Sequence, residues 1–373
     1  MGALDRLSQI SGQLSGTLAS GGRAKILEKH ADDIVVTACL RTAFTKGGKG
    51  GFKDTQASDL MAGAFKGIIT RSKINPALVQ DICVGTIKAG MIEIGIGAGV
   101  ESMSTNYGPQ AVAEFSELLE AHQEAANCKV PMGVLSEQMA KDRHVSRQSQ
   151  DAFAAASYQK AAKAQAEGLF KEEIEPLRVK FEDPKSGETK EVVVDRDDGV
   201  RAGVTAESLG KIKASFAKDG SIHAGNASQI SDGAAAVLLM KRSTAERLGQ
   251  QILGKFVQAS IVGVKPLLMG EGPWAAIPKL FELTGVSKDD VDIFEINEAF
   301  ASQCLWCANE LGLPQEKINP KGGAIAFGHP LGCTGARQVS TLLYELRRRG
   351  QKVGVTSMCI GTGMGMAALW VAE

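Results

Sequence analysis

The sequence contains no apolar run long enough to cross a membrane. A bilayer-spanning helix needs about 18 or more consecutive apolar residues, and no stretch of the 373-residue chain reaches that length. The first residues also lack the apolar core of a secretory signal peptide. We therefore expect a soluble, intracellular protein without a membrane partner.

An excess of either charge is also missing. Lys and Arg together number 42, as do Asp and Glu, so the formal net charge is zero. Proteins that bind nucleic acid usually carry a basic excess. We therefore expect no nucleic-acid partner for this chain.

The cysteines do not form a disulfide pattern. There are seven of them, an odd number spread over a long chain, which is typical of free thiols in a reducing compartment. Cys304 and Cys307 form a Cys-x-x-Cys pair within a helical pattern, but no second Cys or His pair accompanies them. We interpret both as buried helix thiols and expect no metal site.

A connection between two strands is missing as well. DICVG (residues 81–85) and IEIGIGAG (92–99) both have the pattern of buried strands, and only TIKAGM lies between them. Parallel neighbouring strands need a crossover of about a dozen or more residues. Either the two strands are not neighbours or a segment is absent.

An internal repeat favours the absent segment. Residues 60–85 and 275–296 each have an amphipathic helix, a polar linker and an apolar strand introduced by Asp, and residues 87–99 correspond to 347–358. Between these matches the second half holds residues 297–345, whereas the first half holds only Thr86. The sequence therefore predicts a duplicated α/β core whose first half lacks a crossover.

Between the two halves lies a region of different character. Residues 146–168 have an N-cap Ser, an Ala-rich interior and a terminal Gly, which predicts a helix. FEDPKSGETKEVVV (181–194) is typical of a surface β-hairpin. We expect an inserted cap. The predicted division begins with a flexible N-terminal segment at 1–30. The first half of the core comprises residues 31–105 and 229–250 and is truncated near 85–87. The cap comprises residues 106–228, and the second half comprises residues 251–373.

Three stretches of the second half could carry chemistry. INEAFASQ (296–303) follows an apolar strand, GGAIAFGHPLGCTGARQ (322–338) places His329 in a Gly/Pro turn, and SMCIGTGMG (357–365) places Cys359 at a strand end. Taken singly, strand-end capping, a turn histidine and a buried thiol explain them equally well. Together, a base, a thiol and several Gly N–H groups are the components of acyl-transfer chemistry.

These stretches, together with HAGNASQISDGAAAVLL (223–239), resemble the 3-ketoacyl-CoA thiolases of the peroxisomal type. The resemblance runs from about residue 33 to the C-terminus and implies a duplicated, five-layered α/β/α/β/α fold with an inserted cap. It also implies thiolytic cleavage of 3-ketoacyl-CoA by CoA in fatty-acid β-oxidation, with coenzyme A as a substrate and no cofactor. The expected partners are CoA, 3-ketoacyl-CoA and a second copy of the chain.

The resemblance also implies roles for single residues. His329 matches the base that activates the nucleophile, and Cys359 matches the cysteine that exchanges a proton with the acetyl-CoA carbanion and the CoA thiol. Asn297 and the N–H of Gly361 match the two oxyanion holes. The positions that match substrate-binding residues are Ser228, Met132, Ala299 and Phe300.

The chain departs from this family at the nucleophile. The family nucleophile is a Cys followed by Ser-Ser-Gly, and no such stretch occurs here. Cys83 and Cys128 do not match it by motif. We therefore expect an acyltransferase that is inactive as this chain stands. The alternative is a non-catalytic CoA-binding or hetero-dimerising subunit.

The N-terminal segment resembles a targeting signal. RLSQISGQL (6–14) has the form Arg-Leu, five residues, Gln-Leu, which resembles the N-terminal peroxisomal targeting signal that thiolases of this type carry. On a helix, one side would hold Leu4, Leu7, Ile10, Ser11 and Leu14, and a flexible tail could present this apolar stripe to a receptor groove. The alternative is an undirected leader. We expect a peroxisomal import receptor as a partner and the peroxisome as the location.

Overall fold

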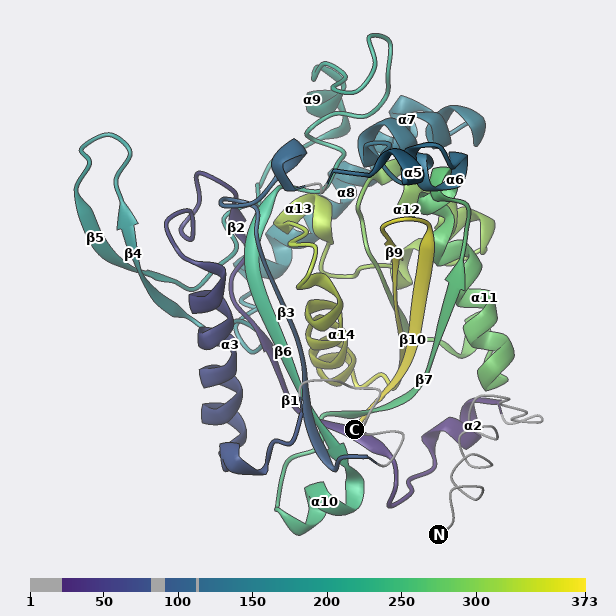
Figure 1. Cartoon of the computed structure of the whole chain (residues 1–373). Coiled ribbons are helices and arrows are strands. Elements are labelled where there is room, and N and C mark those ends of the chain that lie inside the picture. Colours follow the sequence, from purple (N-terminus) through teal and green to yellow (C-terminus); the bar gives the residue numbers. More distant parts are fainter. Residues whose placement is uncertain (1–21, 82–90, 112–113) are drawn as a thin grey trace.

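The computed structural model of the chain describes residues 22–81, 91–111 and 114–373 (Figure 1). Within these ranges, eight strands form one curled sheet in the order β2-β6-β1-β7-β10-β9-β8, and β3 pairs with β6 outside this path. The centre of the order is the antiparallel pair β1 (Ile34–Arg41) and β7 (Gly254–Gly263). This pair joins the two halves of the molecule.

The first half is built on strands that are apolar on both faces. All positions of β1 are buried, as are all but the last of β6, so both strands are covered on two sides. Helix α3 contacts β1, β3 and β6. The elements of this half are β2 (Thr45–Lys46), α3 (Ala57–Ser72), β3 (Ile94–Ser102), β6 (Ser231–Lys241) and α10 (Arg242–Arg247).

The second half repeats this construction. Helix α11 contacts β7, β9 and β10 as α3 contacts the strands of the first half. The elements are α11 (Gly272–Thr284), β8 (Ile293–Ile296), α12 (Ala301–Glu310), α13 (Ala324–Phe327), α14 (Thr334–Arg349), β9 (Val353–Ile360) and β10 (Met364–Ala372). The 3-10 helices of the chain are Pro76–Leu78, Gly108–Ala111, Pro266–Glu271, Lys288–Asp290 and Gln315–Lys317.

Helix α14 is the central layer of the molecule. It contacts β1, β3 and β6 of the first half and β8, β9 and β10 of the second, and Figure 1 shows it between the two groups of strands. From one outer face to the other the layers are α3, the strands of the first half, α14, the strands of the second half and α11. The expected five-layered α/β/α/β/α core is confirmed.

The strand pairing supports the internal repeat. In the second half β8 is parallel to β9, β9 is antiparallel to β10, and β10 is antiparallel to β7. In the first half Asp81 forms a parallel bridge to Gly95 of β3, β3 is antiparallel to β6, and β6 is antiparallel to β1. The strands near residues 81 and 95 are therefore parallel neighbours. The predicted strand at 81–85 falls almost entirely outside the described residues, and the strand predicted at 92–99 is observed as Ile94–Ser102.

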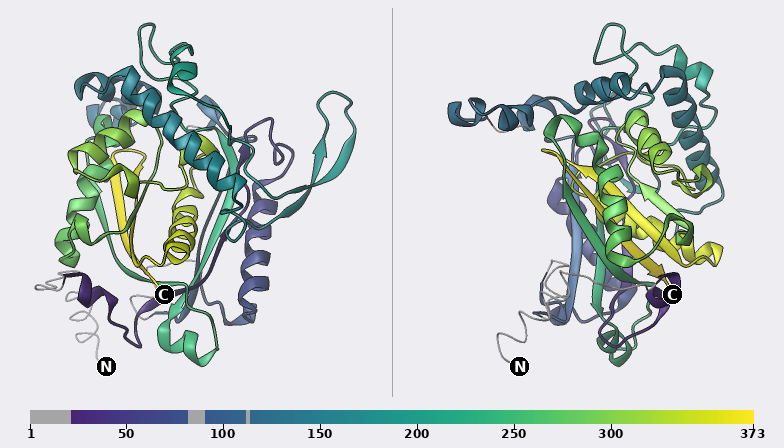
Figure 2. Two further views of the ribbon diagram at one scale, coloured as in Figure 1. Left: turned by 180° about the vertical axis from the view of Figure 1, so that it is seen from behind. Right: turned by 90° about the vertical axis from the view of Figure 1, so that its right-hand side faces the viewer.

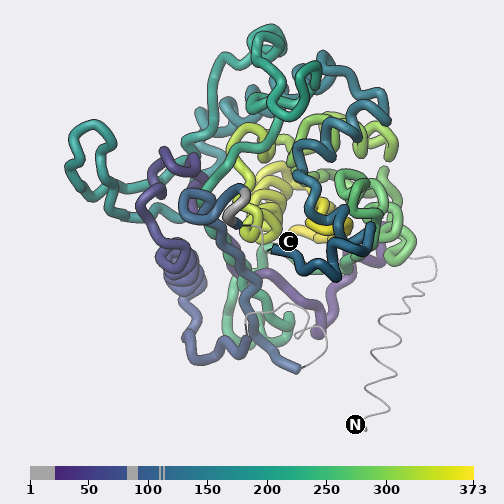
Figure 3. The backbone as a smooth tube through the Cα atoms, turned by 45° about the horizontal axis from the view of Figure 1, so that its top comes forward, coloured from purple at the N-terminus to yellow at the C-terminus, as the bar shows by residue number. Residues whose placement is uncertain are grey.

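The cap lies across one end of the sheet (Figures 2 and 3). Its longest helix, α8 (Arg147–Ala166), begins after Ser146, whose side chain accepts a hydrogen bond from the Ser149 N–H, as the N-cap prediction requires. The predicted hairpin is observed as β4 (Leu177–Glu182) and β5 (Thr189–Val194), which project from the body. The other helices are α5 (Glu117–Glu120), α6 (Gln123–Asn127), α7 (Met132–Asp142) and α9 (Ala206–Gly210). The exact limits of the cap stay a prediction.

A buried ionic network ties the cap to both halves. Arg41 of β1 donates to Glu173 at 2.8 Å and to Asp197 at 2.7 Å, and Lys321 of the second half reaches Glu173 at 2.8 Å. All four side chains are buried. Removal of one member would leave the others charged and unpaired, which is costly in a dry interior.

The described part of the N-terminal segment is a docked helix. The segment 1–30 was expected to be flexible, but residues Gly22–Leu27 form α2. Arg23 forms an ion pair with Asp292 at 2.7 Å, and Ile26 is buried against the core of the second half. The motif at 6–14 lies outside the described residues. Among the described helices, none is long and apolar enough to span a bilayer.

Candidate active site

The catalytic motifs converge at the ends of two parallel strands of the second half. Asn297 directly follows β8, and its N–H donates to the carbonyl of Ser357 on β9 at 2.9 Å. Cys359 lies two residues further along β9. The carboxyl ends of parallel strands are where α/β sheets place their ligands. The strand pairing alone therefore brings Asn297 and Cys359 to one edge.

His329 lies in the turn between α13 and α14, and both of its ring nitrogens have partners. Nδ1 lies 2.6 Å from the hydroxyl oxygen of Thr334, and Nε2 lies 3.1 Å from the side-chain nitrogen of Asn297. Thr334 donates its hydroxyl proton to the carbonyl of Pro330. The Thr334 oxygen can therefore only accept from the imidazole, so Nδ1 carries the ring proton and Nε2 is the free base.

The electrostatics keep this histidine neutral. Burial of the ring lowers the pKa of His329 from 6.5 to about 3, and the nearby positive charge of Arg337 acts in the same direction. Arg337 is itself buried and paired with Glu295 at 3.0 Å. At neutral pH the ring is a proton acceptor rather than a charged donor.

Glu298 holds the turn that carries His329. Its carboxylate accepts hydrogen bonds from Ser157 of α8 at 2.6 Å, from the amide of Asn319 at 2.8 Å and from the N–H of Ile325 at 3.3 Å. A Cβ on Gly323 would lie 2.3 Å from the Glu298 carboxyl carbon, so only Gly fits there. These contacts join Glu298 to α8, to Asn319 and to the start of α13.

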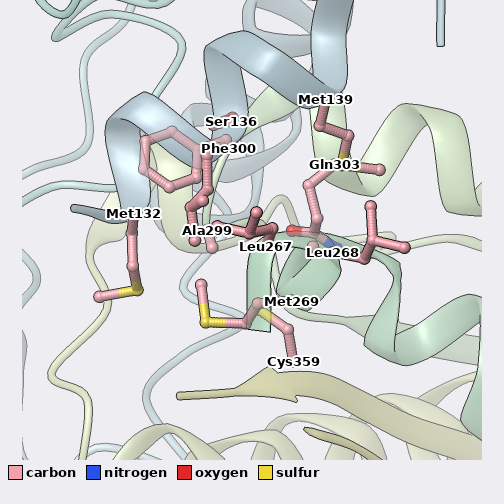
Figure 4. Close-up of a pocket in the computed structure, with 12 residues that line it drawn as sticks. Met132, Ser136, Met139, Leu267, Leu268, Met269, Ala299, Phe300, Gln303 and Cys359 are labelled. Atoms are coloured by element: carbon pink, nitrogen blue, oxygen red, sulfur yellow. The ribbon is translucent and has the colours of Figure 1, made fainter. Parts of the chain in front are cut away.

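Cys359 lies at the base of an apolar pocket (Figure 4). The pocket offers about 20 Å³ of free space, roughly the room of one water molecule, and Met132, Ala299 and Phe300 line it together with Cys359. Burial raises the pKa of the Cys359 thiol from 9.0 to about 11, against a smaller lowering by a backbone hydrogen bond. The thiol is therefore protonated at neutral pH.

Gly361 and Ser228 lie beside this pocket and are not among its lining residues. Gly361 is exposed and begins the turn between β9 and β10, in which Thr362 has a φ of 68°. The N–H of Ser228 donates to the carbonyl of Ala299 at 2.9 Å, which places it behind the pocket wall. The structure thus groups His329 with Asn297, and Cys359 with Met132, Ala299 and Phe300. The catalytic and binding roles of all these residues stay predictions.

No described cysteine is placed as a nucleophile. Cys333 caps the start of α14, but it is fully buried, and burial raises its pKa to about 12. Cys128 is partly exposed, and its thiol lies 3.8 Å from the carbonyl of Thr362. Cys83 lies outside the described residues. As interpreted, Cys304 and Cys307 are buried thiols of α12.

Two residues of the site were not found from the sequence. Thr334 orients His329 and Gln303 lines the pocket. Thr334 stands five residues after His329, but nothing in the spacing says that the chain folds the hydroxyl back onto the ring. Gln303 stands in the INEAFASQ motif, and its closeness in sequence to Ala299 and Phe300 was a usable signal. Among the described residues, no His, Cys, Asp and Glu side chains cluster as a metal site would require.

Comparisons with known proteins agree with the motifs. The thiolase N-terminal domain model matches residues 34–89 and 83–243, and the thiolase C-terminal domain model matches residues 250–372. The peroxisomal 3-ketoacyl-CoA thiolase of Yarrowia lipolytica is 51% identical over 416 aligned residues, which cover 99% of this chain and 100% of that protein.

Solved structures give the same result. The dimeric peroxisomal thiolase of Saccharomyces cerevisiae is 42% identical with a TM-score of 0.84, and the match covers 93% of this chain and 99% of that one. Human mitochondrial 3-ketoacyl-CoA thiolase in complex with CoA is 29% identical with a TM-score of 0.80, and the match covers 92% and 98% of the two chains.

Proposed function

This chain belongs to the peroxisomal 3-ketoacyl-CoA thiolases, acyltransferases of fatty-acid β-oxidation, and from this we propose that it binds CoA thioesters but cannot complete thiolysis by itself. The observation that carries the proposal is a neutral histidine base and a protonated thiol at one sheet edge, with no nucleophilic cysteine beside them among the described residues. Coenzyme A is a substrate in this proposal, and no cofactor takes part.

Cys359 is suited to the proton-transfer half of the reaction. Thiolysis breaks the bond between C2 and C3 of the 3-ketoacyl group and leaves a carbanion on acetyl-CoA. A thiol with a pKa of about 11 is protonated at neutral pH and can give its proton to that carbanion. The resulting thiolate then takes the proton of the incoming CoA thiol, which restores Cys359 and creates the CoA thiolate.

His329 and Asn297 are suited to polarising the thioester and activating a thiol. The unprotonated Nε2 of His329, which lies 3.1 Å from the Asn297 side-chain nitrogen, can accept a proton from a nucleophile, and the Asn297 side chain can orient a water toward a developing oxyanion. The buried Oδ1 of Asn297 has no hydrogen-bond partner among the described residues, which leaves it available to such a water. The N–H of Gly361 would serve the second oxyanion hole.

The missing step is formation of the acyl-enzyme. That step transfers the acyl group at C3 to an enzyme cysteine, and in this family that cysteine begins the helix of the absent crossover. The alignment with the Yarrowia lipolytica relative extends over 416 positions although the chain has 373 residues, and the N-terminal domain match is split at residues 83–89. Both observations support a deletion at this place.

The proposal also covers the oligomeric state and the cellular location of the chain. We infer that the chain forms a homodimer, because the similar Saccharomyces cerevisiae thiolase is dimeric, and that an import receptor reads residues 6–14. The absent crossover would weaken the dimer. A hetero-dimerising or CoA-binding subunit without catalysis is the second candidate, favoured by the presence of His329, Asn297 and the Cys359 pocket without a nucleophile among the described residues.

A thiolysis assay tests the proposal. The purified chain, given acetoacetyl-CoA and saturating CoA, is expected to show no turnover, while calorimetry detects CoA binding. The matched comparison is a chimera in which the crossover of the Yarrowia lipolytica relative replaces the residues around Thr86. We expect this chimera to gain turnover and to lose it again in the Cys359→Ala variant.

Two outcomes would count against the proposal. Turnover of the unmodified chain that survives Cys359→Ala would indicate another nucleophile, and Cys128→Ala and Cys83→Ala would then identify it. A chain that binds no CoA would remove both the thioester-binding function and the alternative of a CoA-binding subunit.

A further inference from the structure

A cluster of seven charged side chains, each at most 1% exposed, lies inside the molecule where the cap meets the two halves. Its members are the cations Arg41, Lys321 and Arg337 and the carboxylates Glu173, Asp197, Glu295 and Glu298. If all of them were ionised, four negative charges would face three positive ones. An uncompensated charge in a dry interior is costly, so the cluster favours one bound proton.

Three of the four carboxylates have several donors. Glu173 accepts from Arg41 and from Lys321, both at 2.8 Å, and Asp197 accepts from two nitrogens of Arg41 at 2.7 and 2.9 Å. Glu298 accepts three hydrogen bonds from neutral donors. Several donors to one carboxylate favour its ionised form, so these three groups are poor places for the proton.

Glu295 of β8 is the carboxylate with the fewest donors. Its Oε2 accepts one hydrogen bond, from Arg337 of α14 at 3.0 Å, and its Oε1 has no hydrogen-bond partner among the described residues. Nε of Arg337 has none either within that part of the chain, so a single contact joins the pair. The contacts therefore assign the proton to Glu295.

The charged groups that face Glu295 come from α14, from the cap and from the segments that follow β8. Burial raises the pKa of Glu295 from 4.5 to about 7, and the charges of Glu173 and Glu298 act in the same direction. The charges of Arg337 and Lys321 oppose this rise. The carboxyl therefore exchanges its proton in the neutral pH range.

The charge on Glu295 reaches His329 through Arg337. The positive charge of Arg337 lowers the pKa of His329. An ionised Glu295 offsets part of that charge, so Nε2 of His329 accepts a proton more readily. A protonated Glu295 leaves the charge of Arg337 uncompensated, which makes Nε2 a weaker base.

We propose that Glu295 is a positioning residue that acts on His329 through Arg337: by binding or releasing one proton, it sets how readily Nε2 accepts a proton. This inference rests on the proposed role of His329 as the base and adds a second group, outside the pocket, that controls it. The base is then stronger above neutral pH than below it.

Nuclear magnetic resonance of the His329 ring tests the coupling in the unmodified chain. The chain has five histidines, and the signal that is absent from His329→Asn is the one to follow. The ring stays neutral in the neutral pH range, so its signal should move in one step near pH 7 because Glu295 titrates there. In Glu295→Gln this step should be absent.

Glu345→Gln is the matched control for this titration. Glu345 lies on α14 and is also 1% exposed, but it is paired with Arg348 and Arg349, which lower its pKa. It is therefore ionised across the neutral range. The His329 signal of this variant should keep the step near pH 7.

Urea unfolding gives a second measurement, whose sign separates the proposal from a structural ion pair. Between pH 4.5 and about 7 the folded chain holds a proton on Glu295 that the unfolded chain has released. The stability that this proton contributes is full below that window and is lost as the pH rises through it. Gln resembles the protonated form at every pH. From pH 5 to pH 8 the unfolding constant of the wild-type chain should therefore rise up to roughly 100-fold relative to that of Glu295→Gln.

Each outcome decides the question. A His329 signal that does not move near pH 7, or a step that persists in Glu295→Gln, would overturn the proposal. A relative loss of stability of Glu295→Gln as the pH rises would also overturn it, because Glu295 would then be an ionised partner of Arg337 with a structural role only.

Two further measurements cover the remaining cases. If Glu295→Gln does not fold, infrared difference spectra of the wild-type chain decide, since a protonated carboxyl band must disappear between pH 6 and pH 8, and its absence would overturn the proposal. Calorimetry with CoA is carried out on the same samples. Absence of CoA binding would reject the proposed function, whereas the titration of His329 reports the coupling independently of it.

Discussion

His329 links the chemistry of the site to the stability of the fold at the scale of a single residue. The folded protein lowers its pKa from 6.5 to about 3 because the ring is buried and faces the charge of Arg337. Between these two values the unfolded chain binds a proton that the folded chain does not. Stability therefore falls as the pH is lowered through this window and is fully retained above it.

We predict that replacing His329 flattens the acid side of the stability profile. In the wild-type chain His329 contributes a slope of up to about 1.4 kcal/mol per pH unit between its two pKa values. His329→Asn removes this titratable side chain. The buried His223 remains in the wild-type chain and in the variant and serves as an internal reference. Urea unfolding from pH 7 to pH 4 measures the difference, and parallel profiles would show that the ring is protonated in the fold.

At the scale of elements, the turn that carries His329 is packed directly on a strand of the first half. A Cβ on Gly99 of β3 would lie 1.8 Å from the carbonyl oxygen of Gly332 and 3.2 Å from the Cα of Cys333. These are backbone atoms, so no side chain can rotate to make room. The first half thus supports the site of the second despite its missing crossover.

We predict that Gly99→Ala destabilises the protein and displaces the turn. The expected loss is about 1–3 kcal/mol, as for overpacked cores. Gly335→Ala is the control, because its Cβ would meet only Met358, at 3.7 Å, and an alanine near the start of α14 should be neutral or stabilising. Urea midpoints measure both. Equal midpoints would mean that β3 and the turn separate easily.

The two equivalent strands β3 and β9 should differ in protection. β9 is hydrogen-bonded to β8 on one side and to β10 on the other, whereas β3 pairs along its length only with β6. On its second side the bridge to Asp81 is the one pairing in the described residues. Edge strands open more readily and favour association.

We predict faster amide exchange in β3 than in β9. Hydrogen exchange followed by mass spectrometry compares peptides that cover Ile94–Ser102 and Val353–Ile360. In the chimera with the restored crossover, β3 should approach the protection of β9. Equal protection in the unmodified chain would mean that the first half is covered by some other contact.

At the scale of the whole molecule, the proposed targeting motif is distant in sequence from the candidate site. The motif at 6–14 precedes α2, whose Arg23 and Ile26 dock on the second half. Import of a folded chain requires no catalytic nucleophile. Loss of thiolysis and delivery to the peroxisome are therefore compatible.

We predict that residues 1–30 direct a fluorescent reporter to peroxisomes. The expected signal is punctate and becomes diffuse after Leu7→Arg, because a charge interrupts the apolar side that a receptor groove would bind. Leu18→Arg, four residues after the motif, tests whether the effect is specific. A diffuse signal from the unmodified segment, or puncta that persist after Leu7→Arg, would contradict the prediction.

Much of this architecture was readable along the chain. The helix after Ser146, the hairpin around residue 185 and the strand that carries Cys359 each depend on local patterns of caps, turns and alternation. The duplication could be predicted because two segments have the same order of helix, linker and strand. Chain reach left two explanations for the short connection after residue 85, and the internal repeat favoured a missing crossover.

What the tertiary structure decided is which groups touch. Nothing local distinguishes Thr334 from another threonine, yet the fold of the turn places its hydroxyl on Nδ1 of His329 and thereby makes Nε2 the base. Gln303 has an ordinary helical position, and only the packing of α7 and the segment before α11 against α12 places its amide in an apolar pocket. Helix and strand propensities and the length of a connection depend on residues that are close in sequence. Tautomers, pKa values and the contacts of buried amides depend on neighbours that are distant in sequence, so they are set only when the layers pack.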